Sequence, residues 1–194
     1  LSRETTVSVD TYHAYTARRA VEAGAHIVND VTGGQGDPDM FAVVAGLDCD
    51  YVVQHGRGNA QSMNDLATYD DVVATVREEL LASRDRAVAA GIAPERIILD
   101  PGLGFAKVGD QDWQVVRGIS AFLGEGHPVL IGQSRKRFLG PVTVGGERDV
   151  ASAVALASNR PRSAPRSTAR TRSAATTSVS ESSGSPAVSR RRTR

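Results

Sequence analysis

Polar and ionisable side chains follow each of five short apolar stretches in this 194-residue chain. The stretches are VSVD at Val7–Asp10, HIVND at His26–Asp30, YVVQHGR at Tyr51–Arg57, IILD at Ile97–Asp100 and VLIGQSRK at Val129–Lys136. Any one of the polar residues could be a helix cap or a solvated surface charge. Those explanations do not predict polar groups after all five stretches. We therefore take the following residues as candidates for one site: Asp10, Asn29, Asp30, His55, Arg57, Asp100, Ser134, Arg135 and Lys136.

The chemistry of this set suits a flat, nitrogen-rich heterocycle. Carboxylates and an amide form hydrogen bonds along an edge of the pterin or purine type, and an analogue without those groups would be rejected. Lysine and arginine suit an anion or a ring carbonyl. The chain has no GxxxxGK[ST] phosphate loop, and Gly102-Leu103-Gly104 is too short a motif for dinucleotide binding. It also has no HExxH or comparable cluster, which argues against a zinc held by the protein.

The elements that must position these residues alternate between strand-like and helix-like sequence. Strand-length apolar runs are separated by amphipathic segments, several of which stop at glycine, as at Gly24, Gly46 and Gly91. We expect strands within 6–9, 25–29, 50–53, 97–100 and 128–131, and helices over about 12–23, 38–45, 69–90, 111–123 and 148–158. Such alternation requires a parallel sheet with helical crossovers.

Two architectures satisfy this pattern, a doubly wound open sheet and part of an eight-fold barrel. An open sheet usually has one glycine-rich phosphate loop and few functional groups at its other strand ends. Polar groups at nearly every strand end are typical of a barrel, whose loops converge on one site. We therefore predict an α/β fold, a partial (β/α)8 TIM barrel that retains about five parallel β-α units.

Charge divides the chain into two parts with different composition. Residues 1–158 carry 14 Lys and Arg against 21 Asp and Glu, a net charge of −7, whereas residues 159–194 carry nine Arg against Glu181, a net charge of +8. We expect an incomplete barrel domain over 1–158 and a disordered, Arg- and Ser-rich tail over 159–194. The single cysteine, Cys49, excludes an internal disulfide, and cytoplasm is the expected compartment. The apolar runs are too short for a membrane span.

Five motifs of the chain resemble those of the dihydropteroate synthase family, the folate-pathway enzymes inhibited by sulfonamides. They are VSVDT at Val7–Thr11, IVNDVTGG at Ile27–Gly34, HGRG at His55–Gly58, ILDPGLGFAK at Ile98–Lys107 and GQSRKRFLG at Gly132–Gly140. They occur in the family's order and cover most of residues 6–158. The last two together are very specific. Gln54 stands where the family commonly has Met, and some members have Ser where this chain has Arg137.

The resemblance implies a transferase that joins 6-hydroxymethyl-7,8-dihydropterin diphosphate to p-aminobenzoate and releases pyrophosphate. It implies that Asp10, Asn29, Asp100 and Lys136 bind the pterin, with Asp100 and Lys136 as the catalytic pair. Phe105, Ser134 and Arg137 would border the aminobenzoate, and His55, Arg57 and Arg135 would bind an anion or support the site. A Mg²⁺ cofactor is implied as well, with its protein ligand expected before Leu1, and a homodimer is implied as the assembly.

Two departures from the family shape the remaining expectations. The family's first two barrel strands would precede Leu1, and its last strand, with an Arg-x-His-Asp-Val motif, would follow Ser158. A shift of reading frame across Thr168–Ser178 permits Gly-Ala-x-Ala-Val-Arg-x-His-Asp-Val, which looks like that last strand. We expect a frameshift rather than a functional tail, an inserted or lost base between the codons of Leu156 and Pro161, and little turnover by this exact chain.

Three other functions remain open at this point. A pterin-binding barrel with methyltransferase-type chemistry is one, although SRKRFLG at Ser134–Gly140 argues against it. A nucleic-acid-binding protein that uses the Arg-rich tail is another, but the tail lacks the interleaved aromatic residues that would strengthen it. A folded remnant without activity is the third.

Overall fold

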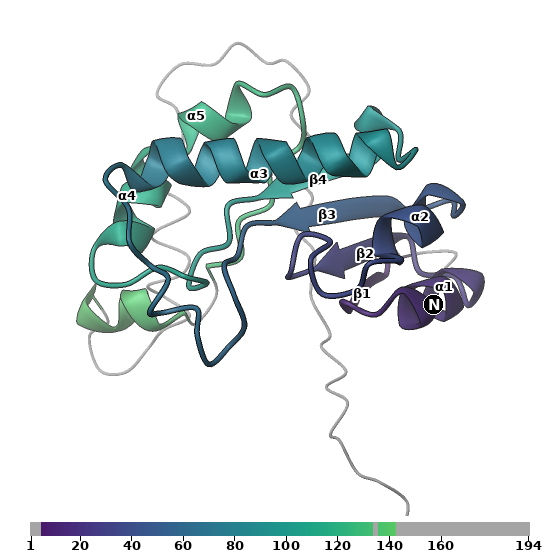
Figure 1. The fold of residues 1–194 in the computed structure, drawn as a ribbon, viewed down its shortest axis with the longest axis horizontal. Helices are drawn as coiled ribbons and strands as arrows, with labels where there is room; N and C mark the ends of the chain where they lie inside the picture. Colours follow the sequence, from purple (N-terminus) through teal and green to yellow (C-terminus); the bar gives the residue numbers. More distant parts are fainter. Residues whose placement is uncertain (1–4, 134–135, 143–194) are drawn as a thin grey trace, which may run out of the picture.

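The computed structural model of the chain describes residues 5–133 and 136–142 (Figure 1). Its sheet contains β1 (Ser8–Asp10), β2 (Ile27–Asp30), β3 (Asp50–Gln54) and β4 (Ile97–Asp100), all parallel and in the order of the chain. Sheet order that follows chain order is expected for consecutive units of a barrel, whereas a doubly wound sheet reverses its order at a switch point. This part of the molecule confirms the α/β prediction and is a partial barrel.

Helices cover one face of the sheet. The helices of the chain are α1 (Ala14–Glu22), α2 (Met40–Ala45), α3 (Val72–Ala89), α4 (Gln111–Arg117) and α5 (Ser120–Leu123). Two short 3₁₀ helices, η1 (Pro94–Arg96) and η2 (Arg137–Val142), precede β4 and follow the fifth stretch. In Figure 1, α3 runs along β3 and β4, while α1 and α2 lie beside β1 and β2. The 18-residue α3 is capped by the Asp71 carboxylate, which accepts a hydrogen bond from the Ala74 N–H.

Alternation along the strands separates an apolar face from a polar edge. Val28, Tyr51, Val53, Ile97 and Leu99 point to the helices and are fully buried in the core. The intervening residues, from Asp10 on β1 to Asp100 on β4, face the opposite side of the sheet. The buried face therefore fixes the register that brings the candidate residues to one side.

The predicted fifth strand is present as a single bridge rather than as a strand. Val129 forms an isolated parallel bridge with Leu99, supported by hydrogen bonds from Leu99 N to the Pro128 carbonyl (2.9 Å) and from Leu130 N to the Leu99 carbonyl (2.8 Å). The fifth stretch thus lies beside β4, as expected, but its pairing does not extend.

The predicted helix over 111–123 is divided into α4 and α5. The break lies at Gly118, where a Cβ atom would come within 2.8 Å of the Val73 side chain on α3. Close approach to α3 at this glycine accompanies the change of direction. The predicted helix over 148–158, the tail and the proposed frameshift region lie outside the described residues.

No helix in the described part of the chain has both the length and the apolar character needed to cross a lipid bilayer.

Candidate functional site

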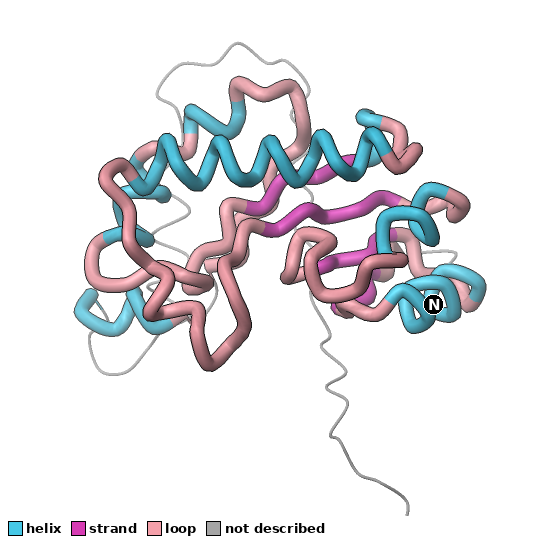
Figure 2. Tube along the Cα trace, viewed as in Figure 1, coloured by secondary structure: helices cyan, strands magenta, loops and turns pink. Residues whose placement is uncertain are grey.

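The carboxyl ends of the strands gather the predicted polar residues at one edge of the sheet. In Figure 1, β2, β3 and β4 point the same way, and Figure 2 shows the long loops that follow β3 and β4 beyond the strand tips. The register pairs Asp10 with Asn29 and Gln54 with Asp100. Because paired residues of neighbouring parallel strands share a face, all four side chains belong to the same open face.

Asp100 is a buried acid at the β4 end of this edge. Asp100 is 3% exposed, and one of its carboxylate oxygens accepts a hydrogen bond from Gly102 N at 2.7 Å. Burial raises the pKa of Asp100 to about 6, while that hydrogen bond and the ammonium groups of Lys136 and Lys107 act in the opposite direction. Asp100 is therefore mostly ionised at neutral pH and close to protonation.

The turn after Asp100 requires glycine. Gly102 has φ +69°, and a Cβ atom there would lie 2.0 Å from the His55 carbonyl oxygen. Gly104 has φ +78°, and its N–H donates to the Asp112 carboxylate at 2.7 Å. Positive φ together with this close approach explains the glycines of the GLG motif as backbone requirements.

Lys136 lies over the face of Phe105. Its Nζ is 4.3 Å from the centre of the Phe105 ring, a cation–π contact. Burial lowers the pKa of Lys136, and the carboxylates of Asp100, Asp112 and Asp10 raise it. Arg137 begins η2 and is exposed, close enough to Asp112 to lower the pKa of that acid. Ser134 and Arg135, which the sequence also predicts for this site, lie outside the described residues.

Asp10 and Asn29 form the other end of the edge. Asn29 Nδ2 donates to Asp10 Oδ2 at 3.1 Å. Burial raises the pKa of Asp10, and the Asn29 hydrogen bond lowers it. Asn29 Oδ1 is buried, and it is the one buried side-chain polar atom among the described residues without a hydrogen-bond partner. A buried acceptor with no partner carries a desolvation penalty, which a ligand donor would relieve.

Asp30 takes part in the core rather than in the open face. It lies on the helix side of β2, is fully buried, and accepts hydrogen bonds from Thr32 N, Thr32 Oγ1, Gly34 N and the Tyr51 hydroxyl (2.7 Å). The strand alternation that sends Asn29 outward sends Asp30 inward. Asp30 therefore organises the loop after β2 and does not reach the other candidates.

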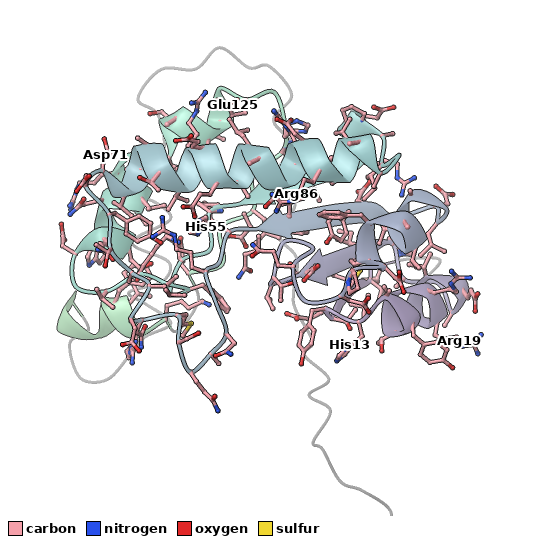
Figure 3. The ribbon with its side chains drawn as sticks, in the orientation of Figure 1. His13, Arg19, His55, Asp71, Arg86 and Glu125 are labelled. Atoms are coloured by element: carbon pink, nitrogen blue, oxygen red, sulfur yellow. The ribbon has the colours of Figure 1, made fainter. Side chains whose placement is uncertain are left out.

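His55 and Arg57 also turn toward the helices, where both bind Glu79 of α3. His55 Nε2 lies 2.9 Å from a Glu79 oxygen, and the Arg57 guanidinium holds the same carboxylate at 2.5 and 3.0 Å. Figure 3 shows His55 at the tip of β3, beneath α3. The anion-binding alternative for these two residues stays a prediction, since the contacts described here are with the protein itself.

The sequence did not single out Lys107, Glu79 or Asp112, yet they connect the predicted residues. Lys107 is 2% exposed, and its Nζ donates to the carbonyls of Gly102 (3.0 Å) and Phe105 (3.1 Å) and lies 3.2 Å from His55 Nδ1. The sequence contains little that would have indicated these three residues. Lys107 stands directly after the apolar Phe105-Ala106 pair, and Glu79 adjoins the buried stripe of α3 that includes Val76, Leu80 and Ser83.

A cleft of about 500 Å³ opens behind this network. It is bordered by the end of β3, the loop after it and α3, through residues that include Gln54, His55, Arg57, Glu79, Ser83 and Arg86. Glu79 and Arg57 therefore border a cleft that is open to solvent. In the described part of the chain, no group of three His, Cys, Asp or Glu side chains is placed to hold a metal ion.

Comparisons with known proteins agree with this geometry. Residues 1–164 match the family described as "Pterin binding enzyme". The dihydropteroate synthase of Mycobacterium leprae is 46% identical over 143 residues, which are 73% of this chain and 50% of that protein. The Thermus thermophilus dihydropteroate synthase solved with 4-aminobenzoate superposes with a TM-score of 0.73 and 38% identity, covering 80% of this chain and 61% of that one.

A second solved structure gives the same picture. The Xanthomonas albilineans dihydropteroate synthase in complex with 7,8-dihydropteroate has a TM-score of 0.71 and 33% identity, covering 79% of this chain and 56% of that one. The chain spans about half the length of the M. leprae relative.

Proposed function

The chain belongs to the family of pterin-binding enzymes, and from that premise we propose that it is the pterin-binding part of a dihydropteroate synthase. The whole protein would join 6-hydroxymethyl-7,8-dihydropterin diphosphate to p-aminobenzoate with release of pyrophosphate. Relatives that bear the name dihydropteroate synthase, and solved relatives with 4-aminobenzoate or 7,8-dihydropteroate bound, support this proposal.

The observation that carries the proposal is the unpaired buried oxygen of Asn29 beside the Asp10 carboxylate. A pterin presents N–H donors and ring-nitrogen acceptors along one edge. Asn29 Oδ1 and the carboxylates of Asp10 and Asp100 would accept hydrogen bonds from the donors. A ligand without donors would leave these acceptors desolvated and unpaired, so the arrangement selects for an amino-substituted heterocycle.

Lys136 completes the proposed recognition of the pterin. Its ammonium lies over the Phe105 ring, and the charges of the Asp100, Asp112 and Asp10 carboxylates raise its pKa. Partly buried, it would donate to an acceptor on the pterin ring. The other face of Phe105, with Ser134 and Arg137, would border the aminobenzoate ring.

The proposed reaction needs no protein nucleophile. The bond between the pterin methylene carbon and the diphosphate oxygen breaks, and its electron pair leaves with pyrophosphate. The resulting cation is stabilised by the carboxylates of Asp10 and Asp100, which a low-dielectric site makes more effective. The aminobenzoate nitrogen then forms the new bond to the methylene carbon and releases a proton.

Four further parts of the proposal rest on the resemblance. A Mg²⁺ ion would help to bind the diphosphate; the described residues do not by themselves form a site for it, and no step above runs through one. A sulfonamide would compete with p-aminobenzoate. A cytoplasmic location and a homodimer are proposed on the same basis.

Calorimetric titration of the 194-residue chain with the dihydropterin diphosphate tests the proposal. We expect saturable binding, weakened at least tenfold by Asn29→Ala and by Lys136→Met, since each removes a buried polar contact worth about 1–3 kcal/mol. Asp85→Asn is the matched control, because Asp85 lies exposed on α3 and pairs with Arg84. Absence of binding by the unaltered chain, or equal loss in all three variants, would contradict the proposal.

A further inference from the structure

Lys107 is a buried cation, and two of its three hydrogen bonds go to the turn that follows Asp100. Its three partners are the carbonyls of Gly102 and Phe105 and the imidazole of His55. A lysine ammonium has three protons to donate, so these partners use its full capacity. Burial of such a group costs free energy unless it is fully hydrogen-bonded, and a site of this kind is strongly constrained in geometry.

The two carbonyls belong to the turn that presents the site residues. Gly102 contributes its N–H to Asp100, and Phe105 contributes its ring to Lys136. Between Phe105 and Lys107 lies Ala106, which has φ +48° and is the one described non-glycine residue with positive φ. A left-handed alanine costs about 1 kcal/mol or more.

Contacts on both sides of Ala106 hold it in this conformation. The Tyr69 hydroxyl donates a hydrogen bond to the Ala106 carbonyl at 2.8 Å, and the Lys107 ammonium donates one to the Phe105 carbonyl at 3.1 Å. Neither Tyr69 nor Lys107 is among the residues expected to touch the pterin. Both act on the backbone that carries Asp100 and Phe105.

His55 and Glu79 hold Lys107 from behind. Because the Lys107 ammonium can only donate, His55 Nδ1 accepts, and the ring proton lies on Nε2, which then donates to Glu79. Burial lowers the pKa of His55 to about 4, and the Lys107 charge acts in the same direction. The imidazole is therefore neutral at physiological pH and has one tautomer.

We propose that Lys107 is a positioning residue of the pterin site: its ammonium, oriented by His55 and Glu79, holds residues 102–106 in the strained turn that aims Asp100 and Phe105 at the ligand. The inference rests on the proposed pterin-binding function for its ligand. It adds three residues, Lys107, His55 and Glu79, that shape the site without contact with the substrate.

The charges around Lys107 determine the pH range over which its ammonium is charged and can hold the turn. It is faced by Asp100 from β4, Glu79 from α3, Asp112 from α4, and by His55 and Arg57 from the end of β3. Burial lowers the pKa of Lys107 to about 8, while Asp112 and Asp100 oppose the shift. Loss of its proton above that pH removes one donor and the charge, so the turn should loosen and pterin affinity should fall.

The composition of the chain makes this directly measurable. Lys107 and Lys136 are the only lysines among its 194 residues. Protein labelled with [¹³Cε]lysine therefore gives two lysine signals, and Lys136→Met assigns them. A titration from pH 6 to pH 11 should show the Lys107 signal with its midpoint near pH 8, about two units below an exposed lysine. The backbone amides of Gly102 and Gly104 should shift with the same midpoint.

Binding of the dihydropterin diphosphate provides the functional readout. We expect Lys107→Met to weaken binding at least tenfold at pH 7 and to reduce the fall in affinity that we expect of the unaltered chain above pH 8. Glu79→Gln should lower the midpoint of Lys107, because it removes a carboxylate that favours the charged amine. Asp85→Asn, at an exposed position on the same helix, is the control and should change neither quantity.

The outcomes separate the two proposals. If the unaltered chain binds no pterin, the proposed function fails, while coupled titration of Lys107 and the Gly102 amide would still support the turn-holding role. If Lys107 titrates near pH 10.5, or if Gly102 and Gly104 do not respond to it, the positioning role is overturned even when pterin binds. Should Lys107→Met fail to fold, the pH titration of the unaltered chain decides the question alone.

Discussion

The two ends of the polar edge are built in different ways. At the β4 end, Asp100 is 3% exposed. Its turn is fixed by hydrogen bonds that Lys107 and Tyr69 donate to the backbone and by one that the Asp112 carboxylate accepts from it. At the β1–β2 end, Asp10 is exposed, one side-chain hydrogen bond joins it to Asn29, and an oxygen of Asn29 is left unpaired. The β4 end is thus preorganised by the protein, whereas the β1–β2 end has hydrogen-bonding capacity that a ligand can use.

This contrast predicts that substitutions at the β4 end change the stability of the fold, while those at the β1–β2 end change ligand binding alone. The largest effect is expected for Gly102→Ala. The added Cβ would lie 2.0 Å from the His55 carbonyl, at a residue with φ +69°. We expect a loss of about 4 kcal/mol or more in the free energy of unfolding, measured by chemical denaturation.

Gly109→Ala is the matched control for that variant. Gly109 also has positive φ, +59°, but a Cβ atom there has nothing within 4 Å. It should lose about 1 kcal/mol, from backbone conformation alone. Equal losses in the two variants would mean that the contact between the turn and His55 is not a constraint.

Asp100→Asn should stabilise the free protein near pH 7.5. The folded-state pKa of Asp100, about 6, lies above the ordinary value of 3.8, so the folded state takes up the proton first as pH falls from 6 to 4 and gains stability there. Above pH 6 the buried charge is a penalty that Asn avoids. The loss of a countercharge for Lys107 and Lys136 opposes this effect. We expect a net gain of about 2 kcal/mol in the free energy of unfolding at pH 7.5, and this gain should disappear by pH 4.

Asp10→Asn is the corresponding change at the other end and should alter stability by less than about 0.5 kcal/mol at either pH. Both variants should lose pterin affinity. A stabilising effect of Asp10→Asn as large as that of Asp100→Asn would remove the distinction between the two ends.

His55→Gln should change the pH dependence of stability in the opposite sense to Asp100→Asn. The folded-state pKa of His55, about 4, lies below 6.5, so the unfolded state takes up the proton first and the fold loses stability as pH falls from 6.5 to 4. Gln does not titrate. Relative to the unaltered chain, the variant should therefore gain about 1–2 kcal/mol between pH 6.5 and pH 4, measured by denaturation at each pH.

The outcome at His55 also tests how the β4 end is held together. If the variant and the unaltered chain change in parallel over this pH range, His55 is not buried as a neutral group, and the assignment of its proton to Nε2 fails. Asp39→Asn, at an exposed position before α2, serves as a control that should leave the slope unchanged.

Much of this arrangement follows from the sequence because strand alternation and glycine placement are local signals. Apolar runs that end in Asp10, Asn29 and Asp100 predict both the strands and the polar edge, and the glycines after Asp100 predict a tight turn. Alternation also separates Asp30 from its neighbour Asn29, a distinction that becomes visible once the register is known. The partial barrel was predictable from the number of polar strand ends.

Non-local contacts could not be predicted in the same way. Lys107, His55 and Glu79 come from three different elements, and their meeting depends on how α3 packs across β3 and β4. The break at Gly118 depends on the approach of Val73, and the fifth stretch pairs only at Val129 although its composition is typical of a strand. In each case the local structure is determined by a tertiary contact rather than by the intrinsic helix or strand propensity of the residues.

The smallest change in stability is expected for Asn29→Ala, and it tests the comparison most directly. The variant removes one exposed hydrogen bond to Asp10, which lowers stability. It also removes the buried oxygen that has no partner, which raises stability, so the two effects oppose each other. The free energy of unfolding should stay within about 0.5 kcal/mol of the unaltered chain while pterin affinity falls at least tenfold. A destabilisation of 2 kcal/mol or more would show that Asn29 is already satisfied in the free protein, and that the β1–β2 end is as preorganised as the β4 end.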